Sequence, residues 1–177
     1  MLKKSIIISI IILVFLSGCS QQQSPVTQKQ EAKYVSTLGN FEFQKPIGWK
    51  TTECKEDCKT DEPLLKLSKE ETSINFFIHE GESNIEQILA EFKSNLQKIP
   101  GANFQIVLED EIRISDEKAK HFILETIVEK DDSKATQEII FLEKNNKLYV
   151  ISSTYKAQNP EIKREFSTIL DTFKINS

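Results

Sequence analysis

Residues 136–173 read TQEIIFLEKNNKLYVISSTYKAQNPEIKREFSTILDTF and contain two strand-like segments, a turn and a helical pattern in succession. The segments 136–143 and 148–155 flank Asn145-Asn146, and asparagine tolerates the positive φ angles of a tight hairpin. Asn159-Pro160 is typical of a helix start, with a cap followed by proline in the first turn. Apolar residues then recur at helical spacing: Ile162, Phe166, Ile169, Leu170 and Phe173. This stretch therefore predicts a hairpin followed by an amphipathic helix.

The region before this hairpin predicts three more strands and a second helix. The strands are expected over 104–108, 111–114 and 119–129, with turns at Glu109-Asp110-Glu111 and Lys130-Asp131-Asp132. The helix is expected to begin at the capping box formed by Ser83 and Glu86 and to bury an apolar stripe. That stripe consists of Ile85, Ile88, Leu89, Phe92 and Leu96.

Closer to the N-terminus, the segments 64–67 and 74–78 predict another hairpin. Phe41 and Phe43 alternate with polar residues, as in a strand, and Lys45-Pro46-Ile47-Gly48 fits a type I turn. The order of elements predicts an α+β fold in which a mainly antiparallel sheet is covered by two main helices.

Three patterns together resemble PsbP-like and DcrB-like domains. They are FEFQKPIGW at 41–49, KLYV at 147–150 after the asparagine turn, and FSTILDTFK at 166–174. The resemblance implies an α/β/α sandwich over residues 39–177. Carriers of this fold have unrelated roles, so the resemblance does not imply a cofactor or a photosynthetic function.

Residues 1–18 have the pattern of a secretory signal. Lys3 and Lys4 precede an apolar run of 12 residues, which is shorter than the roughly 20 residues of a spanning helix. The sequence LSGC at 16–19 resembles the bacterial lipobox. That resemblance implies lipid transfer to Cys19, cleavage before it, and an extracytoplasmic protein held at the cell membrane. Ser20 after the cysteine is similar to the pattern for export to the outer membrane of a two-membrane bacterium.

Residues 19–38 are expected to form the lipidated cysteine and a flexible, glutamine-rich tether, because they contain too few apolar residues to bury. Residues 39–177 are expected to form one globular domain. The net charge of −4 becomes −6 when Lys3 and Lys4 are removed with the leader. This acidic balance argues against a nucleic-acid partner and against attraction to anionic lipids, so the lipid itself would hold the protein at the membrane.

Cys54 and Cys58 are separated by three residues in a polar loop that is expected between Trp49 and Pro63. Outside the cytoplasm, a local disulfide is the first interpretation. A zinc site, with His79 among the weak candidates for further ligands, and redox catalysis are the alternatives.

The two histidines, His79 and His121, do not form a catalytic motif in the sequence, and no catalytic residue or cofactor is predicted. His121 is expected to be a hydrogen-bonded strand residue, whereas His79 is expected to lie in a solvated turn. A Ser-His-Asp arrangement in space stays open in principle. Trp49 and the 11 phenylalanines are expected to fill the core.

The first functional hypothesis is a lipid-anchored, non-enzymatic binding or assembly module of the cell envelope. Its partner would be an envelope protein or a small ligand. The alternative is an envelope redox or metal-binding factor that uses Cys54 and Cys58.

Overall fold

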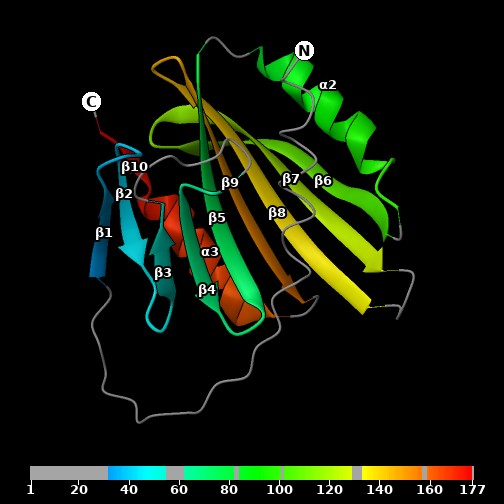
Figure 1. Ribbon diagram of the computed structural model, residues 1–177, viewed down its shortest axis with the longest axis horizontal. Helices are drawn as coiled ribbons and strands as arrows, with labels where there is room; N and C mark the ends of the chain where they lie inside the picture. Colours follow the sequence, from blue (N-terminus) through cyan, green and yellow to red (C-terminus); the bar gives the residue numbers. More distant parts are fainter. Residues whose placement is uncertain are drawn as a thin grey trace.

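The computed structural model describes residues 32–54, 62–81, 84–100, 102–128, 133–156 and 159–176. Their largest element is a seven-stranded sheet with the order β3-β4-β5-β9-β8-β7-β6 (Figure 1). All neighbouring strands in it are antiparallel. Its strands are β3 (Lys50–Glu53), β4 (Leu65–Lys69), β5 (Thr72–Glu80), β6 (Ala102–Ile114), β7 (Glu117–Val128), β8 (Ser133–Lys144) and β9 (Lys147–Lys156).

A small sheet with the order β1-β2-β10 packs beside the large one. Its strands are β1 (Ala32–Ser36), β2 (Phe41–Lys45) and β10 (Lys174–Ile175). Ser36 Oγ donates a hydrogen bond of 2.9 Å to Glu53 of β3 and so connects the two sheets. Residues 32–36 were expected to belong to the tether, but they form a strand because β2 offers them a full antiparallel partner.

The two helices cover opposite faces of the large sheet. α2 (Ile85–Leu96) packs on the side of Ile139 and Phe141, whereas α3 (Pro160–Thr172) packs on the side of Ile140 and Leu142. This alternation along β8 follows from the period of two in a strand. The α+β sandwich expected from the sequence is confirmed.

The helix boundaries agree closely with the sequence patterns. Asn159 caps α3 by accepting a hydrogen bond from the backbone N–H of Ile162, with Pro160 at the first helical position. For α2, the N-cap is Asn84, whose side chain accepts from the backbone N–H of Gln87. The predicted capping box therefore placed the N-cap of α2 one residue too early, at Ser83. Ser83 itself lies outside the described residues.

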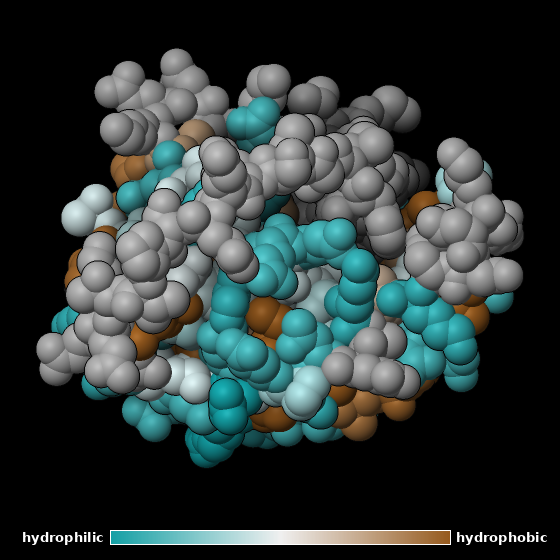
Figure 2. Space-filling model, turned by 90° about the horizontal axis from the view of Figure 1, so that it is seen from below, coloured by the Kyte–Doolittle hydropathy of each residue, from teal (hydrophilic) through white to brown (hydrophobic). Residues whose placement is uncertain are grey.

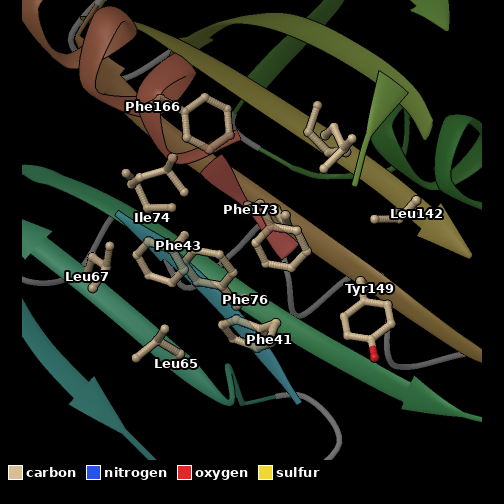
Figure 3. Close-up of a cluster of buried hydrophobic side chains, with 14 of the residues drawn as sticks. Phe41, Phe43, Leu65, Leu67, Ile74, Phe76, Leu142, Tyr149, Phe166 and Phe173 are labelled. Carbon is tan, nitrogen blue, oxygen red and sulfur yellow. The ribbon is translucent and has the colours of Figure 1, made fainter. Parts of the chain in front are cut away.

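The core between the two sheets and α3 is rich in stacked aromatic rings (Figure 3). The ring centroid of Phe76 lies 5.3 Å from that of Phe41 and 5.0 Å from that of Phe43. Phe173, just after α3, lies 5.2 Å from Phe41. Trp49 is only 3% exposed. The expectation that Trp49 and these phenylalanines fill the core is confirmed.

Three local expectations are wrong. Glu109-Asp110-Glu111 is not a turn, because β6 is one long strand with an irregular register between Ile106 and Leu108. His79 lies inside β5, opposite Leu148, rather than in a solvated turn. Residues 50–53 form the edge strand β3 instead of a loop.

The tight turns follow backbone conformation. Asn145 and Asn146 have φ angles of +53° and +59°, which confirms the predicted hairpin between β8 and β9. The turn between β6 and β7 uses Ser115 and Asp116 at +53° and +65°, where the sequence carries no glycine. The expected turn Lys130-Asp131-Asp132 lies outside the described residues.

Candidate functional site

A cluster of ionisable side chains crosses four strands on the α3 side of the sheet. His121 of β7 lies directly opposite Asp110 of β6 and Ile140 of β8. Glu138, two residues before Ile140, points to the same side, as does Tyr155 of β9. We call Asp110, His121, Glu138 and Tyr155 the His121 cluster. It lies next to the apolar core, where such groups are rarely buried without partners.

The cluster is connected by two hydrogen bonds and by one longer contact, in which Nε2 of His121 faces Glu138 without a hydrogen bond. Nδ1 of His121 lies 2.8 Å from Oδ1 of Asp110, and Nε2 lies 3.5 Å from Oε2 of Glu138. The Tyr155 hydroxyl donates a hydrogen bond to Oε1 of Glu138. Glu138 is only 5% exposed, so its carboxylate depends on these neighbours rather than on water. The imidazole is therefore held between two carboxylates.

The electrostatic environment favours a charged pair of His121 and Glu138. The contact with Glu138 raises the pKa of His121; burial opposes this, and Asp110 adds to it. Burial alone would raise the pKa of Glu138, but His121, Tyr155 and the charge of Lys163 lower it below its ordinary value. Burial and the bond to Glu138 raise the pKa of Tyr155. His79, by contrast, has its pKa lowered by burial.

The geometry of the His121 cluster does not match a catalytic triad. Nδ1 of His121 contacts a carboxylate, as in a triad, but Nε2 faces the second carboxylate of Glu138 instead of a nucleophilic hydroxyl. The two carboxylates lie at different ring nitrogens and do not converge on one point. Within the described ranges, no group of three or more His, Cys, Asp or Glu residues is arranged to hold a metal ion.

Beside this cluster, apolar side chains lie on a part of the sheet that α3 does not cover. Figure 1 shows α3 behind β4, β5 and β9, away from the lower parts of β6 and β7. Leu108 and Ile127 are each 38% exposed, and Ile123, opposite Leu108, is partly buried. Glu125 is exposed between Ile123 and Ile127. We call Leu108, Ile123, Glu125 and Ile127 the β6–β7 face.

Among the described residues, exposed large apolar side chains are few. In the view from below, the described residues are mostly hydrophilic, and hydrophobic residues gather in small separate patches (Figure 2). Interfaces that bind a partner reversibly combine an apolar centre with a polar rim. The β6–β7 face has this combination, because the apolar Leu108, Ile123 and Ile127 lie beside the charged Glu125.

An open hollow of about 450 Å³ lies between the start of α2 and the β6–β7 hairpin. Its charges are largely paired with one another. Nζ of Lys118 and Nζ of Lys120 lie 2.9 and 3.7 Å from the carboxylate of Glu111, and Lys144 pairs with Glu117 at 3.3 Å. Because charges of both signs line it, this hollow selects neither an anion nor a cation.

The cysteines predicted as site residues are only partly described. Cys54 is disulfide-bonded and follows β3, with its backbone N–H donating to the carbonyl of Leu64. Cys19 and Cys58 lie outside the described residues, so lipidation and the Cys54–Cys58 pairing stay predictions. His79 is held within β5 and is not brought into a metal cluster among the described residues.

Sequence reasoning identified His121 as a hydrogen-bonded strand residue, and this is confirmed. It missed Glu138 and Tyr155. A usable signal existed: Glu138 shares its strand face with Ile140 and Leu142, and an acid on an apolar face needs a buried partner. The residues that contact Glu138 lie on β7 and β9, and the local sequence pattern does not show that these strands pair with β8.

In the described part of the chain, each helix falls short of the length and hydrophobicity needed to cross a membrane. Neither a family model nor a curated protein matches the sequence.

Several solved structures share the fold at low identity. The chain is similar to cyanobacterial PsbP (CyanoP) from Synechocystis sp. PCC 6803, with 14% identity and a TM-score of 0.61 over 90% of this chain and 98% of that one. It is also similar to the Saccharomyces cerevisiae Ran-binding protein Mog1p, with 10% identity and a TM-score of 0.55 over 82% and 95%. A third similar structure is LpqN of Mycobacterium tuberculosis, which is involved in cell envelope biogenesis. It has 13% sequence identity and a TM-score of 0.53 over 84% of this chain and 91% of that one. The chain therefore has a PsbP-like fold.

Proposed function

We propose that this protein is a lipid-anchored, extracytoplasmic binding or assembly module without catalytic activity of its own. Cys19 would carry the lipid, and residues 20–31 would connect it to β1. Residues 32–177 would then form the folded domain that meets a protein of the cell envelope. This proposal moves the expected domain boundary from residue 39 to the start of β1.

The observation that carries the binding role is the β6–β7 face. Leu108 and Ile127 are large apolar side chains that remain substantially exposed on the part of the sheet that α3 does not cover. Covering them removes apolar surface from water, which is the main driving force of protein association. The adjacent Glu125 adds a charge that restricts which partners fit.

The solved structures with this fold support the proposal. Mog1p binds the protein Ran, and LpqN is involved in cell envelope biogenesis. Mog1p is an example of this fold presenting a surface to another protein. The His121 cluster supports the non-catalytic part of the proposal, because Nε2 of His121 faces a carboxylate, whereas in a catalytic triad it faces a nucleophilic hydroxyl.

Site-specific photo-crosslinking in intact cells tests this proposal. A photoreactive residue is placed at Leu108 or at Ile127 in the full chain, and crosslinked products are identified by mass spectrometry. Matched controls carry the same residue at Val35 or Ile47, which are also exposed and apolar but lie away from the β6–β7 face.

We expect Leu108 and Ile127 to crosslink to the same envelope protein, and the control positions to give little of that product. Equal crosslinking from all four positions, or none from Leu108 and Ile127, would contradict the assignment of this face. The redox alternative would be favoured if the crosslinked partner protein changed its disulfide bonds when Cys54 is replaced.

A further inference from the structure

The His121 cluster lies where the sheet meets α3. Tyr155 belongs to the same buried core as Ile162 and Phe166 of α3. Lys163, also on α3, contributes a positive charge that acts on Glu138. The buried carboxylate of Glu138 is therefore influenced by groups from two neighbouring strands, β7 and β9, and from α3.

The charge balance of this cluster depends on one proton. The titratable and charged groups that face His121 or Glu138 are Asp110 of β6, Tyr155 of β9 and Lys163 of α3. Protonated His121 places its positive charge between the two carboxylates. Neutral His121 keeps one N–H for Asp110, but its other nitrogen then presents a lone pair to the Glu138 carboxylate.

Losing that proton leaves Glu138 insufficiently compensated. Its remaining partners are the Tyr155 hydroxyl and the charge of Lys163, which belongs to an exposed side chain of α3. A buried carboxylate with reduced compensation is costly, because the charge cannot be solvated. Access of water to Glu138 between the sheet and α3 would reduce this cost.

The position of α3 has an internal reporter. The indole Nε1 of Trp49 donates a hydrogen bond of 3.0 Å to Glu165 of α3, and Nζ of Lys69 binds the same carboxylate at 2.9 Å. Trp49 is the only tryptophan of the chain. Its fluorescence and its indole N–H resonance therefore report on the contact between α3 and the sheet.

We propose that the His121 cluster is a proton-dependent link between the sheet and α3, which holds α3 firmly when His121 is protonated and loosens it when His121 is neutral. This inference goes beyond the proposed binding role and does not depend on the identity of the partner. The raised pKa of His121 is consistent with it, because the folded state favours the proton. Stability contributed by the link is present at low pH and lost as the pH rises through that pKa.

The experiment uses the purified full chain in detergent. Trp49 fluorescence and the urea unfolding equilibrium are measured from pH 5.5 to pH 9 for the wild type, His121→Gln and His79→Gln. The chain has only two histidines, so His79→Gln is the matched control. Carbon-bound imidazole proton resonances of the wild type give the two titrations directly.

The unfolding constant of the wild type is expected to increase with pH by up to about tenfold for each unit by which the pKa of His121 is raised. Trp49 fluorescence should change over the same range, His79→Gln should retain both changes, and His121→Gln should lose both. If His121→Gln fails to fold, the imidazole proton resonances of the wild type provide the test. The proposed link requires that His121 titrates above the ordinary pKa of histidine and that Trp49 fluorescence changes over the same pH range. A wild type whose Trp49 signal is unchanged from pH 6 to 9, or a control that removes the change, overturns the proposal.

Discussion

Replacing Tyr155 by phenylalanine tests the energetic value of the His121 cluster most directly. The substitution removes one oxygen atom and keeps the ring in the core. Tyr155 is 6% exposed and Glu138 5% exposed, so water cannot easily replace the lost hydroxyl. Hydrogen bonds to charged groups contribute about 1.5–3 kcal/mol, and we expect a loss of about 2 kcal/mol in the free energy of unfolding.

Urea unfolding at pH 6, followed by Trp49 fluorescence, measures this loss. With a urea dependence of about 2 kcal/mol per molar, the midpoint should fall by about 1 M. Tyr149→Phe is the control, because Tyr149 is equally buried on the same strand and contacts Phe173 through its ring. If Tyr155→Phe shifts the midpoint no more than Tyr149→Phe, Glu138 does not need the hydroxyl and our reasoning about the cluster is wrong.

Four further outcomes are expected. Cys19→Ala should abolish membrane attachment and leave the folded domain intact; a variant that stays in the pellet after a carbonate wash would contradict the anchor. Deleting residues 159–177 should prevent cooperative melting, because the apolar stripe of α3 contributes about 1.5–3 kcal/mol per buried side chain; a sharply melting, soluble product in calorimetry would refute this architecture. The double variant Cys54→Ser, Cys58→Ser should lower the melting temperature only modestly, because the predicted bridge closes a small loop; peptide mapping of unreduced protein that finds both thiols free would remove the predicted bridge. Since the pKa of Glu138 is lowered in the fold, its contribution to stability should be lost as the pH falls through that value, and urea midpoints that stay constant from pH 6 to 3 would contradict it.

Local chemistry in the sequence was sufficient for much of the fold. Asn145 and Asn146 carry the positive φ angles that their hairpin requires, and Asn159 caps α3. The turn and the cap each depend only on residues adjacent in the sequence, so the local sequence pattern is enough to predict them. The two helices were also predictable, because their buried stripes repeat with the helical period.

The edge strands and the candidate site depend on distant partners. Residues 32–36 mix apolar and polar side chains and residues 50–53 are all polar, and both segments become strands because β2 and β4 pair with them. Asp110 was predicted to lie in a turn, since three consecutive acids resemble a solvated loop, but β7 extends the strand and places His121 opposite it. The His121 cluster thus arises from strand pairing, which no local pattern shows.

The two edges of the large sheet lie at different distances from β1, the first strand of the folded domain. β1 is connected to β3 through Ser36 and Glu53, whereas β6 lies at the opposite edge of the large sheet (Figure 1). Six interstrand spacings of about 4.8 Å separate β3 from β6, which is about 30 Å across the sheet. On a chain attached at its N-terminus, a rotation of about 10° around β1 would displace the β6–β7 face by about 5 Å on this scale. If the chain is attached there, small changes in the orientation of the domain would change how far the β6–β7 face reaches from the point of attachment.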